Sequence, residues 1–159
     1  MYPDIDPILK ELDMIIEKKA IRTLFQPIID LQNGEIIGYE ALSRGPEGSP
    51  LESPQALFSA AKKYNRLFKV EKICGDNAIT TFQTSDIDGK IFINLDPSVI
   101  YNFNDGIADN ILISESRVVI ELTERTRIDD FNRFGLALES YIDQGYNLAI
   151  DDAGSGYSG

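Results

Sequence analysis

Four oxygen-bearing side chains lie near the ends of apolar segments, and together they suit the binding of a divalent cation. They are Glu40, Asn94, Glu121 and Asp151, and each comes at the end of a segment that we expect to be a strand. The carboxyl ends of parallel strands meet at one rim of an α/β fold. Three carboxylates and one amide carbonyl are ligands typical of Mg²⁺, Mn²⁺ or Ca²⁺.

Any one of these residues alone is better explained as a polar strand end, because strands stop where the core stops. The set of four favours a site instead, since three like charges on one rim repel one another unless a cation or protons compensate them. The sequence therefore predicts a metal site at the rim of a parallel sheet.

The composition excludes several other kinds of site. The chain has 159 residues and no histidine, which excludes Ser-His-Asp and Cys-His triads and zinc sites built on imidazole. Its single cysteine, Cys74, forms neither an internal disulfide nor a thiolate zinc site. The net charge of -11 argues against a nucleic-acid polymer as partner. We expect no membrane segment and a cytoplasmic protein, because no apolar run is long enough to span a bilayer and no secretory signal opens the sequence.

The elements that must position these residues are short strands alternating with helices. The hydrophobic patterns predict helices over residues 6–19, 53–65, 67–82, 105–113 and 129–143, and strands over residues 23–31, 35–44, 90–95, 117–122 and 147–151. Asn33-Gly34 predicts a tight antiparallel hairpin between the first two strands, since both residues accept positive φ. The later alternation predicts a parallel sheet. A full (β/α)8 barrel needs about 250 residues, so we expect an α/β fold with an incomplete TIM-type barrel.

The segments around these residues resemble, in order, the motifs of the EAL family of cyclic-di-GMP phosphodiesterases. The tripeptide Glu40-Ala41-Leu42, followed by Ser43-Arg44, is similar to the signature that names the family. A lone tripeptide is weak evidence, but the ordered set of matches is specific and covers about residues 24 to 159. The further matches are Phe25-Gln26-Pro27-Ile28 leading to Asp30 and Gly34, Phe92-Ile93-Asn94-Leu95, Glu121-Leu122-Thr123-Glu124 and Asp151-Asp152-Ala153-Gly154-Ser155-Gly156-Tyr157-Ser158.

The resemblance implies a modified (β/α)8 barrel whose first strand is antiparallel, and hydrolysis of cyclic-di-GMP to pGpG with two Mg²⁺ or Mn²⁺ ions. It also implies that residues 1–22 form a helix leading into an EAL domain over residues 23–159, truncated before the last strands of the barrel. Glu124 would position the loop after the Asp-Asp pair, and Arg44 would bind a phosphate oxygen. The implied metal ligands are Glu40, Asn94, Glu121, Asp151 and Asp152, the catalytic residues are Glu40, Asp151, Asp152 and Glu124, and the substrate-binding residues are Gln26, Leu42 and Arg44.

Two residues depart from the family pattern near the expected cleft. Gly45 stands where the family usually has tryptophan, and Ala153 where its Asp-Asp loop usually has phenylalanine. Both changes are expected to remove bulk near the substrate. The family's later lysine, glutamates and glutamine would lie beyond Gly159, so we expect little or no turnover from this chain alone. An incomplete barrel leaves open strand edges, which predicts a homodimer or a larger assembly.

Three interpretations stay open at this point. The parent protein is a metal-dependent phosphodiesterase, or it is a non-catalytic module that binds cyclic-di-GMP or a protein, or it is an unrelated α/β protein whose motifs match by chance. All the implied metal ligands within this span are present, which favours the enzyme.

Overall fold

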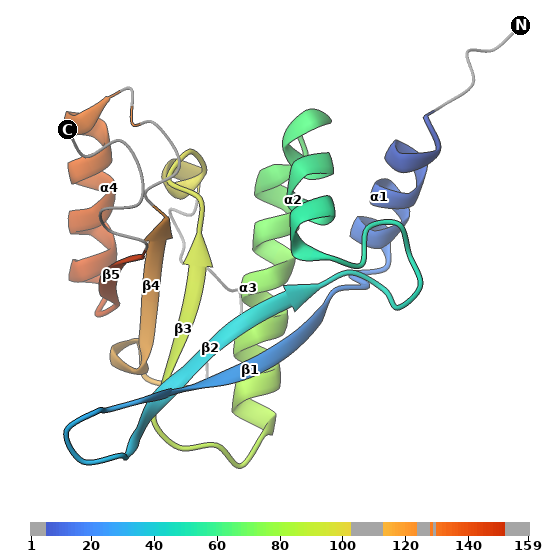
Figure 1. Ribbon diagram of the computed structural model, residues 1–159. Helices are drawn as coiled ribbons and strands as arrows, with labels where there is room; N and C mark the ends of the chain where they lie inside the picture. The colour runs from blue at the N-terminus through green and yellow to red at the C-terminus, as the bar shows by residue number, and fades with distance from the viewer. Residues whose placement is uncertain (1–5, 103–112, 124–127, 129, 152–159) are drawn as a thin grey trace, which may run out of the picture.

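A five-stranded sheet with helices on one face forms the body of the protein (Figure 1). The computed structural model describes residues 6–102, 113–123, 128 and 130–151. The strands lie side by side in chain order, so β1 and β5 are the edges of the sheet in this part of the chain. The strands are β1 (Arg22–Ile29), β2 (Ile36–Arg44), β3 (Lys90–Leu95), β4 (Val118–Thr123) and β5 (Asn147–Asp151).

Helices lie between β2 and β3 and between β4 and β5, as predicted. The described helices are α1 (Pro7–Glu17), α2 (Pro54–Lys63), α3 (Leu67–Thr84) and α4 (Phe131–Asp143), with 3-10 turns η1 (Ile100–Asn102) and η2 (Glu115–Arg117). The ends of these helices and strands fall within about two residues of the predicted ones. The helix predicted over residues 105–113 lies outside the described residues except for its last position. None of the helices in the described ranges has the length and apolar character that a membrane crossing requires.

Side chains at the helix starts explain where three helices begin. Each one accepts a hydrogen bond from an N–H of the first turn that has no partner within the helix. A proline at the first helical position of α1 and α2 adds a fixed φ and needs no such partner. The three pairs are Asp6 with the N–H of Ile8 at 2.9 Å, Ser53 with that of Ala56 at 3.2 Å, and Asp130 with that of Arg133 at 2.9 Å.

The hairpin between β1 and β2 is antiparallel, as Asn33-Gly34 predicts. The predicted tight turn is wrong, because the connection is wider than two residues. Of the turn residues only Gly34 has a positive φ, +74°. Its N–H donates to the Asp30 carbonyl, and the Asp30 N–H donates to the Glu35 carbonyl, each at 2.8 Å. β2, β3, β4 and β5 then pair in parallel, so the expected α/β fold, with an incomplete barrel and an antiparallel first strand, is confirmed.

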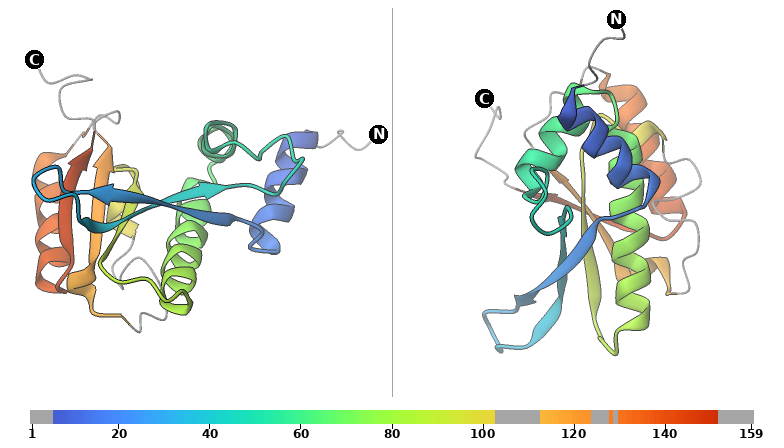
Figure 2. Two further views of the ribbon diagram at one scale, coloured as in Figure 1. Left: turned by 60° about the horizontal axis from the view of Figure 1, so that its bottom comes forward. Right: turned by 90° about the vertical axis from the view of Figure 1, so that its right-hand side faces the viewer.

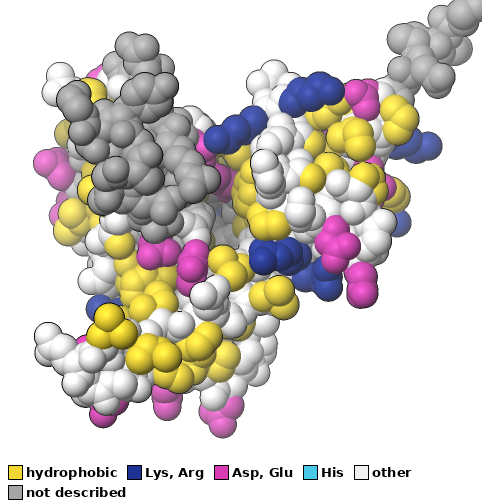
Figure 3. Space-filling view, viewed as in Figure 1, with side chains coloured by type: hydrophobic (Ala, Val, Ile, Leu, Met, Phe, Trp, Pro, Cys, Tyr) yellow, Lys and Arg dark blue, Asp and Glu magenta, His cyan; other side chains and the backbone are white. Residues whose placement is uncertain are grey.

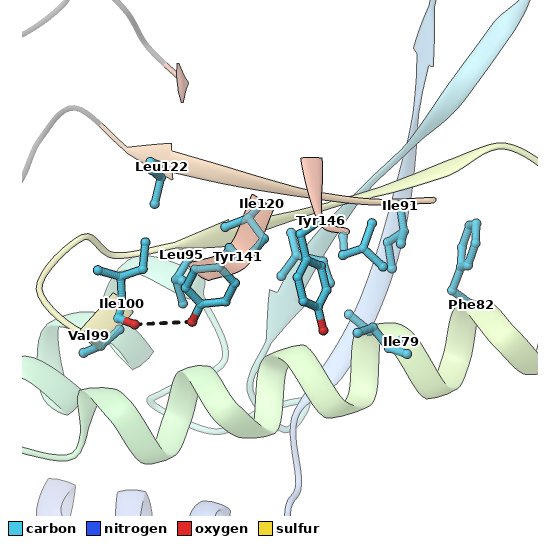
Figure 4. Packing of buried hydrophobic residues seen from close by; sticks show 14 of the residues in the cluster. Ile79, Phe82, Ile91, Leu95, Val99, Ile100, Ile120, Leu122, Tyr141 and Tyr146 are labelled. Atoms are coloured by element: carbon cyan, nitrogen blue, oxygen red, sulfur yellow. Dashed lines mark hydrogen bonds between the residues drawn. The ribbon is translucent and has the colours of Figure 1, made fainter. Parts of the chain in front are cut away.

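Two clusters of buried apolar side chains have α3 in common. The larger cluster lies between the sheet and helices α3 and α4, and Figure 4 shows Ile79 and Phe82 of α3 facing the side chains of β3 and β4. In it the Tyr141 hydroxyl donates to the Ile100 carbonyl at 3.3 Å. The smaller cluster packs α1 and α2 on α3 and includes Ile15. Helices α3 and α4 therefore cover one face of the sheet, and α1 and α2 pack on α3.

The burial pattern of β3 distinguishes the two faces of the sheet. Ile91, Ile93 and Leu95 are buried, whereas Phe92 and Asn94 between them are half-buried. Successive strand residues point to opposite faces. The buried residues face α3 and α4, which lie on the same side of the sheet in the right-hand view of Figure 2. We call the opposite face, which carries Phe92 and Asn94, the site face.

Candidate metal and nucleotide site

The strand register brings three of the predicted metal ligands to the site face. Asn94 of β3 is the direct partner of Glu121 of β4. Glu40 of β2 is the partner of Phe92, two residues before Asn94. Residues paired across a ladder share a face, and so do residues two apart in a strand, while neighbouring strands lie about 4.8 Å apart. Glu40, Asn94 and Glu121 are therefore neighbours on one face.

Glu40 and Asn94 are in direct contact. Nδ2 of Asn94 donates to Oε1 of Glu40 at 2.7 Å. Both side chains are half-buried, as is that of Glu121. An amide that donates through Nδ2 presents its carbonyl oxygen as its other polar atom. Two carboxylates and one amide carbonyl are hard oxygen donors, so this set fits Mg²⁺ or Mn²⁺.

The other predicted ligands lie at the border of the described residues or outside them. Asp151 ends β5, where its backbone pairs with Thr123, two positions beyond the pair of Glu121 with Ala149. The side chain of Asp151, and the whole of Glu124 and Asp152, lie outside the described residues. Within the described ranges no three acidic, cysteine or histidine side chains are grouped so that they could hold a metal ion.

Glu40 does not close its strand, and in this detail the prediction is wrong. β2 continues to Arg44 because its antiparallel ladder with β1 runs on to Arg22, whereas its parallel ladder with β3 ends at the pair of Ala41 with Ile93. Glu40 therefore lies where β2 leaves β3. The last residues of β2 extend the site face beyond the parallel part of the sheet.

The three predicted substrate-binding residues lie on this extension. Gln26 is the direct partner of Glu40, and Leu42 and Arg44 follow Glu40 at alternate positions. Gln26 is exposed, and the other two are half-buried. Arg44 donates through Nη1 to the carbonyl of Ser43 at 2.9 Å. The structure thus places Gln26 beside Glu40, and Leu42 and Arg44 farther along β2 on the same face. The roles of all three toward a substrate stay predictions.

A cavity of about 210 Å³ lies at the end of β2, between the strands and helices α2 and α3. Ser43, Arg44 and Asn94 are the polar residues of its wall, and the others are apolar. The lining residues are Ala41, Leu42, Ser43, Arg44, Pro54, Phe58, Cys74, Ala78, Ile93 and Asn94. The cavity therefore joins the predicted phosphate-binding arginine to the predicted amide ligand.

Gly45 does not leave a gap in the cleft, contrary to the expectation from the sequence. The position is buried, and the following loop folds back over it. The Gly45 N–H donates to the Glu52 carbonyl at 2.9 Å, and Arg22 donates to the Gly45 carbonyl at 3.2 Å. Arg22 also pairs with the Glu52 carboxylate at 3.0 Å. A Cβ at position 45 would lie 2.8 Å from the Leu51 carbonyl carbon, so the loop backbone fills the space that a side chain would need.

The Gly45→Ala substitution is expected to lower the free energy of unfolding by about 1 to 3 kcal/mol, the usual cost of overpacking. The matched control is Gly135→Ala in α4, where a Cβ meets no atom within 4 Å. This control is expected to raise stability by about 0.5 to 1 kcal/mol, because alanine favours a helix over glycine. Urea unfolding of the two variants checks the opposite signs, and a neutral Gly45→Ala would contradict the packing of this loop.

Cys74 lies in the cavity wall and is a buried structural thiol. Burial raises its pKa to about 12, and the thiolate is the reactive form of cysteine. We therefore expect no labelling of native protein by a thiol reagent at pH 8, and complete labelling in guanidinium chloride. Rapid labelling under native conditions would contradict this burial.

A further group of charged residues at the end of β3 was missed in the sequence. Asp96 follows β3, and its carboxylate contacts Lys62 Nζ at 2.6 Å and accepts from the N–H and hydroxyl of Ser98 at 2.9 and 2.6 Å. The Asp96 N–H donates to Glu71 of α3. We call these four residues the Asp96 junction. The available signal was Glu71 itself, a carboxylate directly after Val70 in an apolar helix stripe.

Burial is the largest single influence on the pKa of Glu71 and on that of Asp96. It raises the pKa of Glu71 well above its ordinary value, and the charge of Asp96 acts in the same direction. Burial also acts to raise the pKa of Asp96, but hydrogen bonds from Lys62 and Ser98 outweigh it, so that this pKa is lowered. The two neighbouring carboxyls are therefore held in different protonation states over a range of pH.

Several known proteins resemble this chain along most of its length. An uncharacterized protein of Mycobacterium tuberculosis is 30% identical over 156 residues, which are 90% of this chain and 25% of that protein. The bifunctional diguanylate cyclase/cyclic di-GMP phosphodiesterase MucR of Pseudomonas aeruginosa is 26% identical over 163 residues, 95% of this chain and 24% of that protein. The chain thus spans about a quarter of the length of these relatives.

Solved structures agree with the sequence comparison. The PaMucR phosphodiesterase in complex with cyclic-di-GMP superposes with a TM-score of 0.78 at 26% identity, over 96% of this chain and 66% of that one. A manganese and cyclic-di-GMP complex of BlrP1 from Klebsiella pneumoniae gives a TM-score of 0.71 at 27% identity, over 88% of this chain and 36% of that one. The family model of the EAL domain matches residues 9–159. The interpretation as an unrelated α/β protein is therefore wrong, and this chain belongs to the EAL domain family.

Proposed function

We propose that the EAL domain to which this chain belongs hydrolyses cyclic-di-GMP to pGpG with two divalent cations, Mg²⁺ or Mn²⁺. The observation that carries the proposal is the grouping of Glu40, Asn94 and Glu121 on the site face, with Nδ2 of Asn94 2.7 Å from Oε1 of Glu40. Relatives that are phosphodiesterases, and neighbours solved with cyclic-di-GMP and manganese, support it.

The residues of this chain would divide the work by their positions. Glu40, Asn94 and Glu121 would hold the cations together with Asp151 and Asp152, and Glu124 would hold the loop that follows. Gln26, Leu42 and Arg44 would bind the nucleotide along the extension of β2, where a guanidinium group suits a phosphate oxygen. The bound cations would supply stabilisation of the phosphate charge and activation of a water molecule.

The test is incubation of the full-length protein with cyclic-di-GMP and Mn²⁺, followed by chromatography for pGpG. The proposal predicts pGpG that depends on the metal and disappears with a chelator. Binding of cyclic-di-GMP without any product would contradict it and would establish the second candidate, a non-catalytic module. The 159-residue chain alone is expected to show little or no turnover. We also propose that residues 1–22, which contain α1, lead into the domain, and that the protein is cytoplasmic, with which the free, buried Cys74 is consistent.

We further propose that this chain forms a homodimer or a larger assembly. In the described residues β1 and β5 are open edges, and apolar side chains gather over the β1–β2 hairpin in Figure 3. Leu31 in the hairpin is 97% exposed and Ile150 in β5 is 71% exposed. Exposed edges and apolar patches favour association. Light scattering should give at least twice the monomer mass, and a single monomeric species would refute the assembly.

A further inference from the structure

We propose that Glu71 is a positioning residue that fixes the end of β3, and with it Asn94, for binding of the divalent cation. This inference rests on the proposed function for its metal, but its structural part concerns this chain alone. Glu71 lies in α3, outside the strands that carry the predicted ligands, and is only 7% exposed. Burying a carboxyl group costs free energy unless the group is hydrogen-bonded, so the hydrogen-bond partner of Glu71 indicates its role.

The contact of Glu71 is with the backbone that follows β3. Both carboxylate oxygens accept from the N–H of Asp96, at 3.1 and 3.3 Å. Asp96 comes directly after the last residue of the strand and two residues after Asn94. At this point the parallel ladder with β4 has just ended, at Leu95. Glu71 therefore supplies an acceptor to the first N–H beyond that ladder.

The other contacts of Asp96 fix the same short segment. Lys62 of α2 contacts its carboxylate at 2.6 Å, and the Ser98 N–H and hydroxyl donate to the same carboxylate. The Val99 N–H donates to the Asp96 carbonyl at 3.0 Å. Two helices and the strand end thus meet at a single residue. Because Asn94 lies two residues away, this junction restrains the backbone from which the Asn94 amide reaches Glu40.

Restraint of the backbone next to a metal ligand affects the affinity for the metal. Groups that orient a metal ligand without touching the metal typically contribute a factor of about 10 to 100 in metal affinity. A side chain of similar size without an acceptor would leave the Asp96 N–H without this partner. A glutamine would keep one acceptor oxygen at the same place. The acceptor geometry, rather than the charge, is therefore the property to test.

The experiment compares Glu71→Leu, Glu71→Gln and Ile15→Ala in the 159-residue chain. Ile15 is buried in the cluster of α1, α2 and α3, so its replacement destabilises the fold without touching β3. Two quantities are measured at a temperature where each variant is folded: the dissociation constant for Mn²⁺, and the NMR signal of the Asn94 side-chain amide. Glu71→Met replaces Glu71→Leu if the leucine variant does not fold.

The proposal predicts that Glu71→Leu weakens Mn²⁺ binding by a factor of about 10 to 100 and shifts the Asn94 amide signal. Glu71→Gln should restore both quantities close to their original values, and Ile15→Ala should lower the unfolding midpoint while leaving both unchanged. Unchanged affinity and an unchanged Asn94 signal in Glu71→Leu would overturn the proposal, as would equal losses in Ile15→Ala. If the unaltered chain binds no Mn²⁺, the metal site itself fails, and the Asn94 signal alone decides whether Glu71 positions the strand end.

Discussion

Replacing Glu40 by glutamine is expected to reduce Mn²⁺-dependent formation of pGpG by the full-length protein by at least a factor of about 100, the upper end of what groups that only support a metal ligand contribute. Glu40 contacts Asn94 directly and shares the site face with Glu121. Glutamine has nearly the same shape, but it carries no charge and offers one acceptor oxygen instead of two. A cation held by several oxygens would lose a charged ligand, and Asn94 would lose a charged acceptor. The rate of pGpG formation over a range of Mn²⁺ concentrations measures the effect.

The matched control is Glu17→Gln, which makes the same change of charge at an exposed position at the end of α1. It removes one of many negative charges from a chain whose net charge is -11. If the loss in Glu40→Gln arose from a weaker overall attraction for cations, the control would show it too. We expect the control to keep its full rate. Equal rates for both variants would contradict the placement of the metal at Glu40.

The second large effect concerns stability, and it is expected for Phe82→Ala. Phe82 lies in α3, is 1% exposed, and meets the Phe25 ring of β1 edge-on with the ring centres 5.9 Å apart. The Arg117 guanidinium also lies over the Phe82 ring, 5.2 Å from its centre. Removing a buried phenylalanine costs about 3 to 5 kcal/mol. We therefore expect that much loss in the free energy of unfolding, and a fall in the melting temperature of about 10 °C.

Phe131→Ala is the control for this substitution, because Phe131 is 73% exposed at the start of α4. An exposed substitution usually changes stability by less than about 0.5 kcal/mol. Urea unfolding of both variants, monitored by circular dichroism, gives the comparison. Similar losses in the two variants would show that α3 does not pack on the sheet through Phe82.

Local sequence patterns predicted the helices and strands well, because capping residues and hydrophobic alternation involve only neighbouring residues. The cap at Asp6 and the alternation in β3 are both carried by neighbouring residues. The width of the hairpin was missed because Gly34 alone takes positive φ while the Asp30 backbone closes the turn. Asn-Gly accepts a tight turn but does not require one.

The candidate site could be predicted only in part, because some of its contacts are local in sequence and others are not. Alternation predicts which side chains of a strand share a face, and the strand register then makes Glu40, Asn94 and Glu121 neighbours on the site face. The fold of the loop over Gly45 depends on Arg22, which is far away in sequence. The Asp96 junction likewise joins residues of α2 and α3 to a strand end. Contacts of this range leave no periodic pattern, and only the structure shows them.

The most direct test of the metal site is a map of Mn²⁺ binding on the 159-residue chain by NMR. A bound Mn²⁺ ion broadens the amide signals of nearby residues, so small additions identify its position. We expect selective loss of the signals of Glu40, Asn94 and Glu121, while those of exposed acids such as Glu17 and Glu139 persist. This loss should disappear in Glu40→Gln. Broadening that is strongest at the exposed acids, or that is the same in Glu40→Gln, would contradict a metal site on this face of the sheet.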